Sequence, residues 1–302
     1  MLKKLVALLF VLTSFMSPVA LASEKPTVTV TTSFLEDMVT QIAGDTVQIE
    51  LIMPAGSDPH LYEPKANDAK KILDAELVLY HGLHFEGKMI DILEQAGVAV
   101  TKDFDTKQLG EMEEDGQIET DPHFWFDIAL YKQAVVTTSQ TLQEKFPEHK
   151  DTFAQNTQTY LTKLDELDTY IQAELTHLPK EKRFLVTPHD AFNYFARAYE
   201  FTVYAPQGIS TDSEVSNQQI KETAQFIVDN KIPAIFAEST TNPERMNKLQ
   251  EAAQSLGYTV KVVHGENQEL FSDSLAPKGE KGDNYIEMYR HNIDLILSNL
   301  IH

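Results

Sequence analysis

Residues 147–179 read PEHKDTFAQNTQTYLTKLDELDTYIQAELTHLP, a stretch without glycine that has prolines only at its two ends. Its apolar and aromatic side chains recur mostly every three or four residues, the spacing of one helix face; they are Phe153, Tyr160, Leu161, Leu164, Leu167, Ile171, Leu175 and Leu178. Pro147 suits the first turn of a helix, and Pro179 suits its end. We therefore predict one rigid connecting helix about 45–50 Å long. Two shorter helices within one lobe are the alternative.

Short β-rich runs alternate with helical patterns on both sides of this stretch, which predicts an α/β fold with mostly parallel sheets flanked by helices. The expected strands are Thr27–Thr32, Val47–Met53, Leu77–Tyr80, Arg183–Thr187, Phe201–Tyr204, Ala234–Ala237 and Tyr258–Val263. The expected helices include Phe34–Ala43, Ala129–Glu144, Ser216–Asn230, Pro243–Leu256 and Asn284–Leu300. Because 302 residues suit about two domains, we predict an N-terminal lobe over 23–146, the linking helix over 147–179 and a C-terminal lobe over 180–302.

Charge and composition exclude several classes of protein. Lys and Arg total 25 against 46 Asp and Glu, a formal net charge of −21. Such a surface repels phosphate backbones, so we expect no nucleic-acid partner. The chain has no cysteine, which excludes disulfides, thiolate metal sites and cysteine nucleophiles. With 42% hydrophobic residues, 12 Gly and 13 Pro, it is neither fibrous nor mostly disordered.

Residues 1–22 have the layout of a secretory signal peptide. Lys3 and Lys4 precede an apolar run that begins at Leu5, and Ala20-Leu21-Ala22 supplies the small residues of a cleavage site. We predict an exported protein, periplasmic or extracellular, that is cleaved after Ala22. An uncleaved anchor is the alternative, but the apolar run is short for a span of about 20 residues. A lipoprotein signal needs a cysteine at the cut, so we expect no such lipid anchor.

Three of the ten histidines directly follow a proline, in Asp58-Pro59-His60, Asp121-Pro122-His123 and Thr187-Pro188-His189. Proline fixes its own φ and favours an extended residue before it, so each imidazole stands on a stiff segment. Stiff presentation reduces the entropy that is lost when a side chain binds a metal. His189 also ends an apolar strand, and ligands bind at the carboxyl ends of parallel strands. These three residues are therefore candidate metal ligands.

A cation site also needs a carboxylate, and two residues are candidates. Asp283 lies in a glycine-rich loop before the last predicted helix, where it could instead serve as the N-cap of that helix. Glu238 follows the predicted strand Ala234–Ala237. His81 and His84 could form a minor site, although packing or solvent exposure is the simpler interpretation. The acidic run over residues 111–121 is most simply a solvated loop.

Several motifs, taken together and in order, resemble one known family. They are Gly56-Ser57-Asp58-Pro59-His60, Tyr62-Glu63-Pro64, Gly82-Leu83-His84-Phe85-Glu86-Gly87, Asp121-Pro122-His123-Phe124-Trp125-Phe126-Asp127, His189-Asp190-Ala191-Phe192, Gly208-Ile209-Ser210-Thr211 and Gly282-Asp283-Asn284-Tyr285. The sequence is similar over essentially its whole length after the leader to the zinc/manganese solute-binding proteins of bacterial ABC importers, in which a long helix joins two lobes.

The resemblance implies that His60 and His123 from the first lobe and His189 and Asp283 from the second bind the metal. It implies a non-enzymatic, monomeric receptor that carries Mn²⁺ or Zn²⁺ to a membrane permease and its ATPase. Three imidazoles and one carboxylate suit Zn²⁺, whereas Mn²⁺ prefers sites with more oxygen ligands. Zinc-specific relatives often have a His-rich loop where this chain has its acidic run. Manganese relatives often have glutamate in place of His189, so both metals stay open.

Two other functions are alternatives to such a receptor. A secreted zinc hydrolase normally keeps three protein ligands and an open position for water. Four protein ligands would close the site, and the sequence contains no His-Glu-x-x-His motif. A surface adhesin with a merely structural metal is the second alternative. Exchange of the metal without unfolding of the protein would argue against that adhesin.

Overall fold

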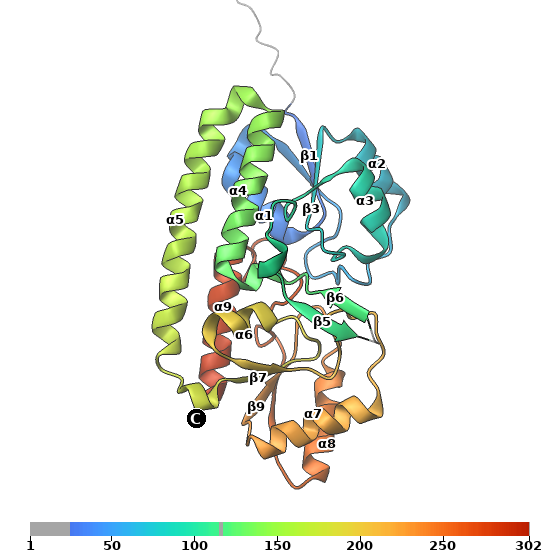
Figure 1. Ribbon diagram of the computed structural model, residues 1–302, viewed down its shortest axis with the longest axis vertical. Coiled ribbons are helices and arrows are strands. Elements are labelled where there is room, and N and C mark those ends of the chain that lie inside the picture. The colour runs from blue at the N-terminus through green and yellow to red at the C-terminus, as the bar shows by residue number, and fades with distance from the viewer. Residues whose placement is uncertain (1–24, 115–116, 302) are drawn as a thin grey trace, which may run out of the picture.

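The computed structural model describes residues 25–114 and 117–301. Two lobes lie one above the other along the longest axis of the molecule, and a long helix runs along one side (Figure 1). This arrangement confirms the predicted α/β fold with a linking helix. The predicted leader over residues 1–22 lies outside the described residues.

The N-terminal lobe contains a four-stranded parallel sheet with the order β2-β1-β3-β4. Its strands are β1 (Thr27–Val30), β2 (Gln48–Leu51), β3 (Leu77–Tyr80) and β4 (Val98–Ala99). Its helices are α1 (Ser33–Ala43), α2 (Ala66–Asp74) and α3 (Ile90–Ala96). Every residue of β3 is buried, as expected for a central strand of a parallel sheet covered on both faces.

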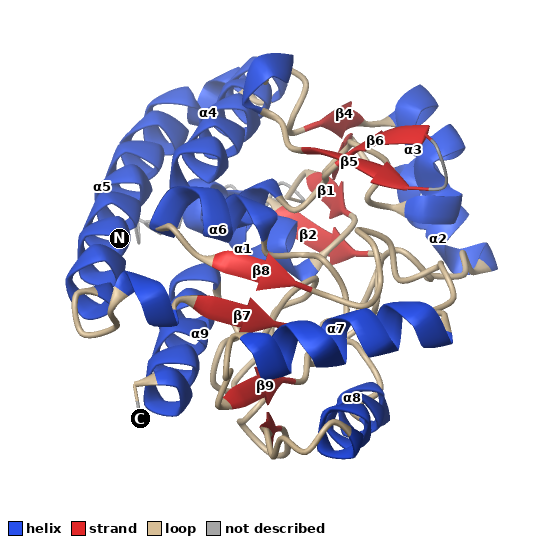
Figure 2. Cartoon of the chain, turned by 60° about the horizontal axis from the view of Figure 1, so that its bottom comes forward, coloured by secondary structure: helices blue, strands red, loops and turns tan. Residues whose placement is uncertain are grey.

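The C-terminal lobe contains two parallel strand pairs that lie side by side (Figure 2). The strands are β7 (Phe184–Val186), β8 (Thr202–Tyr204), β9 (Ala234–Phe236) and β10 (Lys261–Val263). The helices are α6 (Asn193–Tyr199), α7 (Asn217–Asp229) and α8 (Glu244–Ser255). His189 follows β7 and Glu238 follows β9, and the two side chains are in contact; because the His189 ring lies 5.4 Å from that of His123 in the N-terminal lobe, the carboxyl ends of these strands lie at the boundary between the lobes.

The long helix is α5 (Lys150–Leu175), and a short 3₁₀ turn over Pro147–His149 precedes it. It packs against α1, α4 (Ile128–Lys145) and α9 (Tyr285–Leu300). The buried side chains of α5, from Phe153 to Leu175, belong to one hydrophobic core that takes residues from both lobes. The helix is therefore a packed part of that shared core, and this packing limits how far the lobes can separate.

The acidic run does not form the solvated loop that we expected. It forms an antiparallel hairpin of β5 (Glu111–Glu114) and β6 (Gln117–Thr120), in which Glu111 lies opposite Thr120. The hairpin lies at the boundary between the lobes (Figure 1). Met112 and Ile118 stand among glutamates, but the hairpin does not bury an apolar face, since Met112 is only half-buried. Ile118 is 74% exposed.

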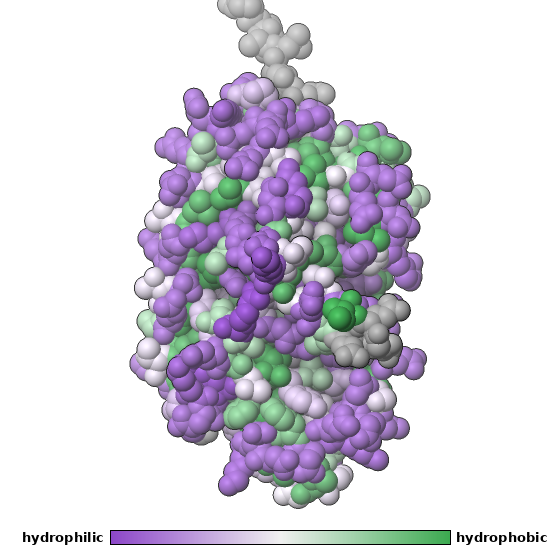
Figure 3. All heavy atoms as spheres, viewed as in Figure 1, coloured by the Kyte–Doolittle hydropathy of each residue, from purple (hydrophilic) through white to green (hydrophobic). Residues whose placement is uncertain are grey.

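The face seen in Figure 3 is mostly hydrophilic, with small and scattered apolar patches. Among residues 25–114 and 117–301, we find no helix with the length and apolar character needed to cross a bilayer.

Candidate metal centre

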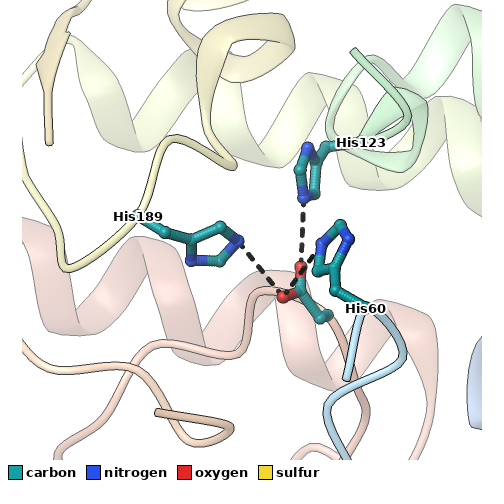
Figure 4. A group of neighbouring side chains, drawn as sticks. His60, His123 and His189 are labelled. Atoms are coloured by element: carbon teal, nitrogen blue, oxygen red, sulfur yellow. Dashed lines mark ion pairs between the residues drawn. The ribbon is translucent and has the colours of Figure 1, made fainter. Parts of the chain in front are cut away.

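The three Pro-His segments meet between the two lobes. His60 lies in the loop after β2, His123 directly precedes the 3₁₀ turn Phe124–Phe126, and His189 follows β7. The imidazoles point toward one another (Figure 4), and the His123 ring centroid is 5.4 Å from those of both His60 and His189. Together with Asp273 they form the one group of metal-ligand side chains found in the described part of the chain. Their potential ligand atoms all lie within 4.8 Å of one another.

Asp273 faces all three imidazoles. Its Oδ1 lies 3.3 Å from His123 Nε2, and its Oδ2 lies 3.1 Å from His189 Nε2 and 3.7 Å from His60 Nε2. His123, His189 and Asp273 are fully buried, and His60 is 7% exposed. The four side chains therefore form a closed pocket for one cation.

The expected carboxylate, Asp283, is not part of this group, and that prediction has to be corrected. Its Oδ2 accepts the backbone N–H of Gly279 at 2.7 Å, and its Oδ1 accepts the side-chain amide of Asn284 at 3.1 Å. Asp283 therefore closes the turn that precedes α9. It is not the N-cap of that helix either, because the side chain of Asn284 accepts the N–H of Glu287.

The sequence patterns did not reveal Asp273, because its position depends on contacts with the other lobe. Trp125 Nε1 donates to the carbonyl oxygen of Ser272 at 2.9 Å. On the other side of Asp273, Ser274 Oγ accepts the backbone N–H of Gly56 at 2.7 Å. Ser33 Oγ accepts the N–H of residue 275 at 3.0 Å and lies 3.1 Å from Ser274 Oγ. The first lobe thus holds the segment of the second lobe that carries the carboxylate.

Five polar atoms at the centre make no well-oriented hydrogen bond in the described part of the chain, and the Asp273 oxygens lie only at ion-pair distance from the imidazole nitrogens. They are the Nε2 atoms of His60, His123 and His189 and both carboxylate oxygens of Asp273. Burying a polar atom without a partner is strongly unfavourable. A cation bound among these three nitrogens and two oxygens would satisfy all of them together.

Two further carboxylates orient the histidines from outside. His123 Nδ1 lies 2.7 Å from Asp121 Oδ1, and His189 Nδ1 lies 2.5 Å from Glu238 Oε2. A carboxylate on Nδ1 keeps the proton on that atom and leaves Nε2 free to bind a metal. Glu238, the second candidate ligand from the sequence, therefore contacts Nδ1 of His189, on the side of the ring away from the metal centre.

Carboxylates next to the rings also shift the pKa values of the imidazoles. Burial alone would lower the pKa of His123, but the neighbouring Asp121 and Asp273 raise it to about 9. Burial also opposes a charge on His189, yet Glu238 and Asp273 raise its pKa well above the usual value. Among the described residues no carboxylate contacts His60 Nδ1, and burial lowers the pKa of His60 to about 3. The neighbouring carboxylates therefore favour the protonated form of His123 and His189, whereas burial favours the neutral form of His60.

Aromatic side chains surround the first-lobe half of the centre. The ring centroids of Phe85 and Trp125 lie 5.1 Å from His60 and 5.2 Å from His123, respectively. His81 is buried among these rings with its Nε2 2.7 Å from Thr32 Oγ1, whereas His84 is exposed. His81 and His84 therefore belong to the packing and to the surface, which was the simpler interpretation of their sequence.

Known proteins resemble this chain over most of its length. The family model described as zinc-uptake complex component A, periplasmic (ZnuA), matches residues 28–299. The zinc-binding protein TroA of Treponema pallidum is 39% identical over 292 residues, which cover 95% of this chain and 92% of that protein. The manganese-binding lipoprotein MntA of Bacillus subtilis is 37% identical over 284 residues, which cover 92% of this chain and 91% of that protein.

Solved structures agree with these relatives. One structure of a TroA, from work on its metal-binding specificity, superposes with a TM-score of 0.91 at 58% identity. The superposition covers 92% of this chain and 100% of that one. The similarity therefore extends over both lobes and the linking helix.

Proposed function

This chain belongs to the family of zinc-uptake complex component A, and we propose that it is the extracytoplasmic metal-binding protein of an ABC importer. It binds one divalent transition-metal ion between its lobes and delivers the ion to a membrane permease that works with an ATPase. The relatives named for zinc or manganese binding support this function over most of the chain.

The observation that carries the proposal is the set of unpartnered ligand atoms. Three imidazole nitrogens and two oxygens of Asp273 point into one buried position, and they are drawn from both lobes. A receptor that captures a cation needs such a set of ligands, whereas a catalytic metal site needs an open position for water. The exposed fraction of 7% at His60, against 0% at the other three, leaves little room for a substrate. We therefore propose a binding function without catalysis.

Zn²⁺ and Mn²⁺ are both proposed as cargo. Three imidazoles and one carboxylate match the ligands of tetrahedral Zn²⁺. Because both oxygens of Asp273 face the centre, the carboxylate can also bind through two atoms and raise the number of oxygen ligands. This second arrangement suits the preference of Mn²⁺ for oxygen, although the Irving–Williams order favours Zn²⁺ at most nitrogen sites.

The proposed function also includes export of the protein and delivery of the metal to a permease. We propose that the leader over residues 1–22 is removed after Ala22 and that the mature protein acts as a monomer outside the cytoplasmic membrane. Intact-mass measurement of the mature protein tests the cleavage, since it should begin at Ser23. Copurification with a permease through a tag on this chain tests the partner.

Two measurements test the metal assignment. Elemental analysis of protein purified from its native host, without chelators or added metals, should find about one Zn or Mn per chain. Titration calorimetry of the stripped protein should show tight binding of Zn²⁺ and Mn²⁺ and weak binding of Ca²⁺, which prefers six to eight oxygen ligands. Stoichiometric copurification of no transition metal, with no binding in the titration, would overturn the proposal.

A further inference from the structure

His60 lies on the side of the metal centre that faces solvent. It is 7% exposed, while His123, His189 and Asp273 are completely buried. A hollow of about 600 Å³ lies against it, lined by His60, by residues of both lobes such as His84 and Ser210, and by Thr120 at the end of β6. A cation that enters or leaves through this hollow passes beside His60.

The segment that carries His60 contacts the second lobe through Asp58. Oδ1 of Asp58 accepts the backbone N–H of His60 at 3.0 Å. Oδ2 of the same carboxylate accepts the hydroxyl of Thr211 in the C-terminal lobe at 2.6 Å. Asp58 therefore connects the backbone of a ligand residue to the opposite lobe through a part-buried hydrogen bond, in which Thr211 is 4% exposed and Asp58 is half-buried.

Thr211 is itself connected to the other side of the metal centre. The side-chain amide of Gln207 donates to the carbonyl oxygen of Thr211 at 2.9 Å and to that of Ser213 at 2.5 Å. Gln207 lies beside His189 in a parallel bridge, and Arg245 donates to its side-chain oxygen. The loop Gln207–Ser213 therefore links the backbone at His189 to Asp58, and through Asp58 to His60.

This loop is bordered by space on several sides. The hollow against His60 touches it at Ile209, Ser210 and Asp212. A second hollow of about 420 Å³ is lined by Thr211, Asp212 and Ser213, and a third of about 740 Å³ by Gln207, Gly208 and Ser213. Because space adjoins the loop, a movement away from Asp58 meets open space, at the cost of exposing the buried side chains of Ile209 and Thr211.

The opposite side of the centre is held more firmly. There, the segment around Asp273 is tied to the first lobe by four hydrogen-bond contacts, which involve Trp125, Ser33 and Gly56. The lobes also share the core along α5. A path for the metal should therefore open where the lobes are joined less tightly, which is beside His60.

We propose that Asp58 and Thr211 form a latch between the lobes that positions His60 and controls the rate at which the metal passes it. When the hydroxyl of Thr211 releases Asp58, the loop Gln207–Ser213 can move and the segment that carries His60 gains freedom. His60 can then leave the metal first, while His123, His189 and Asp273 still hold it. This inference rests on the proposed metal-binding function.

The test measures metal release from the full-length mature protein. Protein loaded with Zn²⁺ or Mn²⁺ is mixed with excess EDTA, and the release rate is followed by stopped flow. Thr211→Val removes the hydroxyl and keeps the shape, and should raise the release rate about tenfold to hundredfold, since a hydrogen bond to a charged group is lost. Thr211→Ser keeps the hydroxyl and should release metal within about threefold of the wild-type rate.

Two further variants separate the latch from a general loss of structure. Thr223→Val is the matched control, because in the described part of the chain the buried Thr223 hydroxyl donates to the carbonyl oxygen of Gln219 in its own helix, and its release rate should stay at the wild-type value. In an Asp58→Ala background, release should already be fast and Thr211→Val should add nothing, because interacting residues are not additive. Co²⁺-loaded Thr211→Val should keep the visible spectrum of the wild type, since all four ligands remain.

The outcomes are distinct. Fast release from Thr211→Val, with wild-type rates for Thr211→Ser and Thr223→Val, supports the latch. Wild-type release from Thr211→Val overturns the latch and leaves metal binding intact. Equal acceleration by Thr211→Val with and without Asp58 also overturns it, because the two residues then act independently. A wild-type protein that binds neither Zn²⁺ nor Mn²⁺ overturns both this inference and the proposed function.

Discussion

The indole Nε1 of Trp125 donates a hydrogen bond to the carbonyl oxygen of Ser272 at 2.9 Å. Trp125 is two residues after His123, and Ser272 directly precedes Asp273. The bond therefore connects the backbones beside two members of the metal centre that come from opposite lobes. It sets the distance between an imidazole and the carboxylate across the boundary.

Replacing this donor should weaken metal binding. Trp125→Phe keeps an aromatic ring but removes the N–H and part of a buried ring, so affinity should fall about threefold to tenfold and unfolding free energy by about 1–3 kcal/mol for the lost bond plus a cavity cost. Calorimetry and urea unfolding measure the two effects. The control is Phe146→Leu at the far end of α4, where Phe146 is 4% exposed. It should lower stability alone, and an equal loss of affinity in the control would refute the role of Trp125.

The two aspartates should behave differently when each is neutralised. Asp273→Asn removes a negative charge from a buried position that faces three imidazoles, so affinity should fall by orders of magnitude. Asp283→Asn changes only the turn before α9 and should leave affinity near the wild-type value. Calorimetry with Zn²⁺ compares the variants directly. A large loss in Asp283→Asn would restore that residue to the site.

Glu238 and Asp121, which contact Nδ1 of His189 and His123, should affect metal affinity almost as strongly as the ligands themselves. Glu238→Gln and Asp121→Asn keep an acceptor for the Nδ1 proton but remove its charge, so each should lower metal affinity about tenfold to hundredfold. Glu244→Gln makes the same chemical change at an exposed position of α8 and serves as the control. Unchanged affinity in both buried variants would mean that the charge behind the ring is unimportant.

Metal binding should release protons and weaken as pH falls. Against the effect of burial, Asp121 and Asp273 raise the pKa of His123 to about 9, and Glu238 and Asp273 raise that of His189 well above its usual value, so the metal-free fold favours the protonated form of both rings. About two protons should leave per metal bound. Calorimetry in buffers of different ionisation enthalpy counts them, and Asp121→Asn should reduce the number to about one. Binding without proton release at pH 7 would contradict these protonation states.

The raised pKa of His123 also affects the stability of the metal-free protein. A histidine whose pKa rises from 6.5 to about 9 on folding stabilises the fold fully below pH 6.5, and this contribution is lost as pH rises through 9. His60 acts in the opposite sense, because its pKa falls to about 3 and its protonation on unfolding destabilises the fold below pH 6.5. Urea unfolding of Asp121→Asn should therefore show a smaller loss between pH 6.5 and 9 than the wild type.

Removing the metal should leave the fold intact. The shared core along α5 and the separate core in each lobe are built without any contribution from a metal. After chelation, the far-UV circular dichroism should therefore persist while the melting temperature falls. A metal at one hundred times its Kd adds about 2.7 kcal/mol of stability. Collapse to an unfolded chain would show that the ion is a structural element.

Local patterns in the sequence predicted the secondary structure and most of the centre. Strand signals placed β1, β2, β3 and β7 to β10, because alternating and β-branched runs fit a sheet wherever the chain folds. The prolines before His60, His123 and His189 likewise act locally, because proline restricts the backbone of its own segment. The sequence alone therefore indicated these three histidines as candidate ligands. The acidic hairpin was missed, because pairing of β5 with β6 outweighed the polar composition.

Only the tertiary structure identified Asp273. Nothing in its immediate sequence separates it from the other aspartates, and the contacts that hold it are remote: Trp125 is 147 residues from Ser272, and Ser33 is 241 residues from Ser274. Asp283 has the more suggestive local sequence, but its carboxylate is used by its own turn. Periodicity and proline reveal what a segment does by itself. The position of a buried carboxylate depends on which distant groups hold its backbone and on which other side chains have already taken their hydrogen bonds.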